Sequence, residues 1–159
     1  GLWASSYLAA YRGVDASVAA RFASLFFLGI TLGRFLCGFI TEVLGDRKMI
    51  RYGLVLVLLG IFLVFLPQNA LALAGILIIG LGCAPIYPSI IHSTPDNFGA
   101  ENAQAIVGIQ MASAYVGSTF MPPLFGLLAQ HVSVGLYPLY LLLFAVLMFF
   151  MSEKLNKIV

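Results

Sequence analysis

YGLVLVLLGIFLVFL, residues 52–66, contains no charged side chain. A soluble domain must cover its core with polar side chains, but this stretch offers none on any helical face. The whole chain shares this character, because 62% of its residues are hydrophobic and 9% are charged, whereas soluble domains are about half apolar and a quarter charged. The composition excludes a soluble fold and predicts helices that cross a lipid bilayer.

Clusters of charged residues, Pro, Gly and Asn divide the rest of the chain into a short apolar opening and several longer segments. A spanning helix needs roughly 20 residues, so the opening, Gly1 to Ala10, is too short to span. We interpret it as the outer end of a helix whose beginning is missing. The segments that can each cross are Val18–Leu44, Ile50–Leu66, Leu71–Ile91, Ala103–Ala129 and Val134–Met151.

These segments predict an all-α, polytopic transmembrane helix bundle. A β-barrel is excluded because the apolar runs are too long and lack the alternation of barrel strands. Cys37 and Cys83 have no nearby Cys or His that would complete a metal or redox motif, so we expect neither a metal nor a cofactor. The net charge of +2 is small and its basic residues are dispersed, so we expect no nucleic-acid partner.

Basic residues are concentrated in two places, the connection after the first crossing and the tail after the last crossing. Lys and Arg are absent from residues 67–70 and 130–133. By the positive-inside rule, the two basic connections lie in the cytoplasm, which predicts a multi-pass protein of the cell membrane with a cytoplasmic C-terminus. Arg12 is the one contrary residue. The basic residues are Arg47, Lys48 and Arg51 after the first crossing, and Lys154 and Lys157 in the tail after the last.

The second and last crossings are apolar all round, apart from Gly, Tyr and Pro138, and we expect them to face lipid. The other three carry polar residues, glycines and prolines that would be costly against acyl chains, so we expect them to line an interior. Pro85 and Pro88 predict a kink in the cytoplasmic half of the third crossing. One helical stripe of the first crossing is polar or small: Thr31, Arg34, Cys37, Gly38, Thr41 and Glu42.

Residues 38–48, GFITEVLGDRK, resemble the G-x-x-x-D-R-x-G-R-K loop signature of major facilitator transporters. Gly38 and Gly45 match, while Glu42 stands where the signature has Asp and Val43 where it has Arg. Residues 80–99, GLGCAPIYPSIIHSTPDNFG, resemble the tenth helix and following loop of the fucose permease-like branch of sugar transporters.

The resemblance places residues 1–159 in the C-terminal half of such a transporter, from the end of helix seven to helix twelve. It implies alternating access, a lipid bilayer and the missing N-terminal half as partners, and a small-molecule substrate, a sugar or similar polar solute. It also implies a gating latch in the loop signature, in which a carboxylate meets a basic residue or a helix N-terminus. The latch residues would be Gly38, Glu42, Gly45, Asp46, Arg47 and Lys48.

Arg34 lies about ten residues from the cytoplasmic end of its helix, and an ionised side chain inside a membrane is a functional candidate. It could contact substrate or act in gating. The alternative is a structural ion pair with Glu42. No carboxylate lies at mid-depth in the sequence, so the proton site of a symporter would belong to the missing half. We interpret His92, beside the end of its helix, as structural.

Six further residues are candidate substrate contacts. The alternative for each is an interfacial aromatic anchor or a hydrogen bond between helices. An efflux carrier for drug-like solutes and a non-transporting assembly subunit also stay open. A membrane enzyme is disfavoured because no nucleophile with a base is visible. The six residues are Trp3, Tyr7, Tyr87, Gln110, Ser113 and Tyr115.

Overall fold

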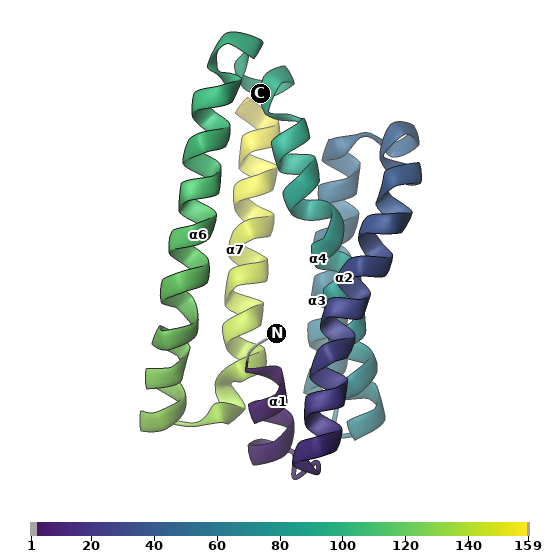
Figure 1. Ribbon diagram of the computed structural model, residues 1–159, viewed down its shortest axis with the longest axis vertical. Helices are drawn as coiled ribbons and strands as arrows, with labels where there is room; N and C mark the ends of the chain where they lie inside the picture. The colour runs from purple at the N-terminus through teal and green to yellow at the C-terminus, as the bar shows by residue number, and fades with distance from the viewer. Residues whose placement is uncertain (1–2, 159) are drawn as a thin grey trace.

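The computed structural model describes residues 3–158, except for the side chain of Ala23, and this part of the chain is helical apart from short turns and contains no strand. The long helices α2, α3, α4, α6 and α7 run along the long axis of the molecule (Figure 1). The elements are α1 (Ala4–Ser6), the π-helical turn η1 (Tyr7–Tyr11), α2 (Ala16–Leu44), α3 (Asp46–Phe65), α4 (Asn69–His92), α5 (Thr94–Phe98), α6 (Ala100–His131), the 3₁₀ turn η2 (Val134–Leu136) and α7 (Tyr137–Ile158).

Four segments of the described chain are long and apolar enough to cross a membrane: α2, α3, α4 and Val134–Ile158, which joins η2 to α7. The predicted all-α membrane bundle is therefore confirmed. α6 is longer, with 32 residues, but it carries Gln, Ser and Thr side chains along its length and is not in this group. A fifth crossing through α6 stays a prediction.

Two predicted connections are shorter in the structure than the sequence indicated. Gly45 alone separates α2 from α3, and its φ of +75° is a conformation that glycine adopts readily. The basic residues that we assigned to this loop lie instead in the first turns of α3, and Lys154 and Lys157 lie in α7, which continues to Ile158. The charged side chains therefore do not mark the ends of these helices, which continue through them.

The basic residues nevertheless gather at one end of the bundle, where α3 begins and α7 ends (Figure 1). Arg51 forms a bidentate ion pair with Glu153, with hydrogen bonds of 2.8 Å from Nε and Nη2 to the two carboxylate oxygens. We call this end, with Arg47, Lys48, Arg51, Lys154 and Lys157, the basic end. The opposite end holds α1 and η1.

Glycines set the contact between α3 and α4. A Cβ atom on Gly60 would lie 2.7 Å from the carbonyl oxygen of Gly75, and one on Gly53 would lie 2.6 Å from that of Gly82. Real side chains do not fit at such distances, so only glycine lets the two backbones come this close. α4 continues as one helix through Pro85 and Pro88 and forms the centre of the packed part of the bundle.

At the end opposite the basic end, the Arg12 side chain caps the C-terminus of α3. Its guanidinium donates hydrogen bonds to the backbone carbonyls of Val64 and Leu66, and its Nε donates to the Tyr7 hydroxyl at 3.1 Å. These carbonyls belong to the last turn of the helix, where the partial charge of the helix is negative. The residue that contradicted the charge rule therefore has a structural partner.

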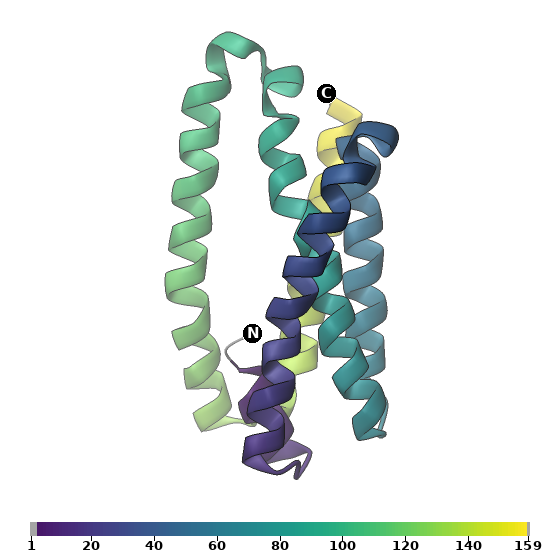
Figure 2. The same cartoon turned by 45° about the vertical axis from the view of Figure 1, so that its right-hand side comes forward.

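α6 stands to one side of the other long helices (Figure 2). Of its described residues, only Phe125 and Gly126 are buried. Its attachments lie at separate points: Gln110 and Thr94 hydrogen-bond each other at 3.2 Å, and Tyr140 of α7 donates to the carbonyl of Met121 at 3.1 Å. The buried Phe125 of α6 also packs against the rings of Trp3, Tyr137 and Tyr140. α6 is therefore held at separate points rather than by a continuous apolar seam.

Candidate functional site

A groove of about 650 Å³ lies between α2 and α4, and Met111 of α6 also lines it. It brings together Arg34 and Tyr87, two of the predicted substrate contacts, with Gly38 of the loop signature. The remaining lining residues include Thr41 and Cys37, which come from the predicted polar stripe of α2. In full, the lining consists of Arg34, Cys37, Gly38, Thr41, Ala84, Tyr87, Pro88, Ile91, His92 and Met111.

Small residues on two facing helices place Arg34 at this groove. A Cβ atom on Gly29 would lie 2.5 Å from the Leu77 carbonyl oxygen, and one on Gly33 would overlap the Cβ of Ala84. Since Gly29 and Gly33 are one turn apart, they form a seam that presses α2 onto α4. Arg34 directly follows the seam and therefore emerges at its edge.

Arg34 is exposed, and among the described residues it forms no ion pair. The pairing with Glu42 that we held as an alternative is not observed. The ion pairs of the described chain are Arg51 with Glu153 and His92 with Asp46. Because no described lining residue of the groove is acidic, the Arg34 guanidinium gives the groove a positive charge that no described lining residue neutralises.

Two residues of the loop signature, Asp46 and Arg47, form contacts at the basic end of the same groove. The Asp46 Oδ2 atom lies 2.6 Å from Nδ1 of His92, the last residue of α4. The neighbouring Arg47 donates from Nη2 to Oδ1 of Asn97 in α5 at 3.4 Å. The signature thus ties the start of α3 to the end of α4 and to α5.

The sequence did not reveal which residues of the signature make these ties. Glu42, the expected latch carboxylate, is exposed and has no hydrogen bond or ion pair within the described chain, whereas Asp46 has His92. Asn97 was not anticipated at all. Its only signal in the sequence is its place in a short polar connection after α4.

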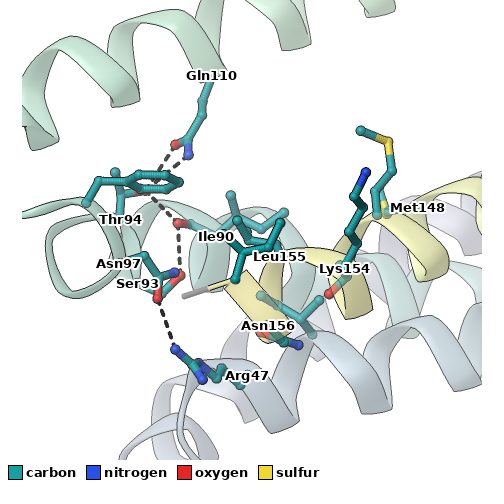
Figure 3. A pocket seen from close by; sticks show the side chains of 15 residues that line it. Arg47, Ile90, Ser93, Thr94, Asn97, Gln110, Met148, Lys154, Leu155 and Asn156 are labelled. Carbon is teal, nitrogen blue, oxygen red and sulfur yellow. Dashed lines mark hydrogen bonds between the residues drawn. The ribbon is translucent and has the colours of Figure 1, made fainter.

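Gln110 lies in a different pocket, of about 390 Å³, at the basic end (Figure 3). The buried Thr94 donates to the Ile90 carbonyl at 2.8 Å and pairs with Gln110. Arg47 and Lys154 also line this pocket, together with apolar residues of α3, α4 and α7. The structure therefore separates Gln110 from Arg34 and Tyr87.

The other predicted contacts are dispersed. Trp3 lines a third cavity, of about 260 Å³, and its indole donates to the Pro122 carbonyl at 3.0 Å. Tyr7 is 2% exposed and packs between the rings of Tyr11 and Tyr137. Ser113 and Tyr115 are exposed on α6. Within the described chain, no group of His, Cys, Asp and Glu could hold a metal ion.

Comparisons with known proteins place this arrangement in context. The chain is 29% identical over 121 residues to a probable nitrate transporter of Staphylococcus carnosus, which is 73% of this chain and 31% of that protein. It is 30% identical over 122 residues to a probable nitrate transporter of Staphylococcus epidermidis, with 74% and 31% covered. The chain thus spans about a third of these relatives. No solved structure matches it.

The sequence model of the Major Facilitator Superfamily matches residues 1–153. This match agrees with the loop signature and with a bundle of apolar helices long enough to cross a membrane. The family is one of membrane transporters, whereas the fucose permease-like branch is not confirmed, because the relatives carry the name of nitrate transporters. The chain therefore belongs to the Major Facilitator Superfamily.

Proposed function

We propose that this chain forms part of a carrier that moves a small anion of the nitrate type by alternating access, with the solute in the groove between α2 and α4. The observation that carries this proposal is Arg34, whose guanidinium lines that groove and has no ion-pair partner among the described residues. Both curated relatives are named as probable nitrate transporters, and the chemistry of the groove is compatible with that kind of solute.

A guanidinium is suited to nitrate because both groups are planar. Arg presents N–H donors in a fixed fork that can engage two oxygen atoms of a planar oxyanion at once. Arg34 lies about ten residues, or roughly 15 Å of helix, from the end of α2, so it is far from the headgroups. Tyr87 lines the same groove and offers a hydroxyl donor to a bound anion, whereas the Thr41 hydroxyl already donates to the Cys37 carbonyl at 2.7 Å.

A sugar is the second candidate, and it rests on the resemblance of residues 80–99 to the fucose permease-like branch. Sugars bind through several hydrogen bonds and through stacking on aromatic rings. Trp3 and Tyr7, the two candidate contacts whose rings could stack on a sugar, pack against other side chains of this chain. A small anion needs fewer contacts, and we therefore favour it. Efflux of an apolar solute agrees less well with a charged groove.

The position in the membrane is also a proposal. The basic end would face the cytoplasm, because Lys and Arg concentrate there, and the C-terminus would lie on that side. The remaining wall of the transport pathway would come from an N-terminal half, and α1 with η1 would be the outer end of helix seven. Every Asp and Glu of the chain lies at or near a helix end, so proton coupling would use a group outside these residues.

Uptake of nitrate by the complete gene product in proteoliposomes tests the role of Arg34. We expect Arg34→Gln to lower kcat/KM by about 10- to 100-fold, the cost of losing hydrogen bonds to a charged group. Arg34→Lys keeps the charge but loses the fork, and should retain part of the activity. Arg21→Gln, an exposed position near the start of the same helix, is the matched control.

The outcomes separate the candidates. Nitrate uptake that is unchanged in Arg34→Gln would contradict an anion contact at this residue. Uptake of a neutral sugar in place of nitrate, by the parent protein, would favour the sugar-transporter branch. Uptake of neither solute, with correct insertion, would favour the efflux carrier or the assembly subunit.

A further inference from the structure

The pocket at the basic end has a composition unlike that of the groove. Its floor is apolar, made by Ile50, Ile90, Met148, Met151 and Leu155. Its charged lining residues are Arg47 and Lys154, and none of its described lining residues is acidic. The pocket therefore pairs a hydrocarbon-like interior with two positive charges.

Figure 3 shows how the two cations are placed. The Lys154 side chain extends from α7 toward the space between α7 and α6, while Arg47 lies on the far side of the pocket, beside Asn97. The Arg47 guanidinium has one long hydrogen bond, of 3.4 Å, to Asn97. The Lys154 ammonium has no hydrogen bond or ion pair within the described residues, and Glu153 beside it is already paired with Arg51.

We propose that this pocket binds an anionic phospholipid, with an acyl chain against the apolar floor and the phosphate at Lys154, while Arg47 adds positive charge from the far side of the pocket. Charge complementarity argues for this occupant, because a neutral lipid would leave both cations uncompensated. The pocket lies at the end of the spanning helices, where headgroups meet the hydrocarbon. Basic pockets between transmembrane helices bind anionic headgroups in this way.

The polar residues of the pocket have a defined part in this arrangement. Asn97 holds Arg47 toward the pocket, and the pair of Thr94 and Gln110 fixes the neighbouring part of α6. A lipid seated here would contact α3, α4, α5, α6 and α7 together. It would therefore connect α6 to the rest of the bundle at the end where direct packing is sparse. The inference requires only that the helices span a bilayer, and it does not depend on the solute.

The test measures lipid preference at the pocket directly. The complete gene product with Phe98→Trp, a pocket-lining aromatic position, is placed in phosphatidylcholine vesicles that contain either brominated phosphatidylglycerol or brominated phosphatidylcholine. Subtracting the parent protein isolates the quenching of the new tryptophan. We expect phosphatidylglycerol to bind this position at least about fivefold more tightly than phosphatidylcholine, as expected for one nearby basic residue.

Variants of α7 separate a site from general attraction to a basic surface. Lys154→Gln should remove about fivefold of the preference for phosphatidylglycerol, and Lys154→Arg should keep it. Lys157→Gln, in the same helix but outside the pocket lining, should leave the preference unchanged.

Three results would overturn the proposal. Equal quenching by the two brominated lipids would show that the pocket does not select an anionic headgroup. Equal losses in Lys154→Gln and Lys157→Gln would indicate diffuse surface attraction. No quenching by either lipid would indicate that protein, such as another helix, fills the pocket.

Discussion

Glycines occur in both α4 and α6, yet two of each helix have opposite surroundings, while Gly126 of α6 is buried against the Trp3 ring. Gly75 and Gly82 of α4 face the backbone of α3 at distances that no side chain could occupy, whereas Gly108 and Gly117 of α6 have nothing within 4 Å of where a Cβ would lie. In a membrane, small residues let helices approach because packing, rather than exclusion of water, drives association. Gly75 and Gly82 therefore already contact a neighbouring helix, whereas Gly108 and Gly117 have no neighbour among the described residues.

The difference indicates what each helix does. α3 and α4 form a close-packed unit that carries one wall of the groove. α6 presents small and polar residues to its surroundings, as a helix would if its packing partners were other helices or a solute. A glycine pattern in a spanning segment thus predicts that another helix can approach closely, but it does not indicate which helix.

The largest expected effect comes from filling the contact between α3 and α4. Gly60→Leu places a side chain where the Gly75 carbonyl lies 2.7 Å from the ideal Cβ. We expect a loss of roughly 3 kcal/mol or more of stability, since overpacking costs about 1–3 kcal/mol even where side chains can move, and here the obstacle is backbone. Thermal unfolding of the detergent-solubilised protein, followed by size-exclusion chromatography, measures it.

Gly117→Leu is the matched control on α6, where the same side chain meets no neighbour within 4 Å in this chain. A protein that tolerates Gly60→Leu as well as Gly117→Leu would show that the contrast between the two helices is wrong. Equal damage from both would show that α6 has a tight partner in the complete protein, which would sharpen the comparison.

A smaller effect is expected from Arg12, which closes the packed unit at the end opposite the basic end. Arg12→Gln removes a cation from the last turn of α3 and hydrogen bonds to two of its carbonyls. We expect a loss of about 1–2 kcal/mol, typical of a charged group at a helix C-terminus. Arg21→Gln, at an exposed position whose side chain makes no hydrogen bond or ion pair within the described residues, should change the unfolding midpoint much less. Equal shifts would argue against the cap.

The attachment of α6 through Gln110 should matter less. Gln110→Ala removes its hydrogen bond with Thr94, which keeps its bond to the Ile90 carbonyl, so we expect about 0.5–1 kcal/mol. Hydrogen exchange should become faster in α5 and the adjoining part of α6 and stay unchanged in α3. Gln104→Ala, an exposed position on α6, is the control. Unchanged exchange in α5 would mean that this pair does not hold α6.

The sequence predicted the long helices because an apolar run without charges has one stable form in lipid. It could not predict the partners of those helices. Gly33 and Ala84 decide where Arg34 emerges, and Arg12 meets Val64 and Leu66 across fifty residues of chain. Periodicity places a residue on a face of its own helix, but the neighbour of that face is set by packing between helices. For that reason Gln110 and Arg34 were grouped together although they line different pockets.

The smallest expected effect concerns the start of α2. The Asp15 carboxylate accepts hydrogen bonds from the Ser17 hydroxyl and from the backbone N–H groups of Ser17 and Val18, and these bonds lower the pKa of Asp15 below its ordinary value of 3.8. A carboxyl whose pKa is lower in the folded state stabilises that state above its unfolded pKa. This contribution is lost as the pH falls through the pKa of the folded state.

The unfolding midpoint of the parent should therefore fall slightly more between pH 5 and pH 3 than that of Asp15→Asn, which keeps a cap without the charge. If the unfolding midpoints of the parent and of Asp15→Asn change in parallel with pH, the charge of the Asp15 cap has no effect on this end of α2.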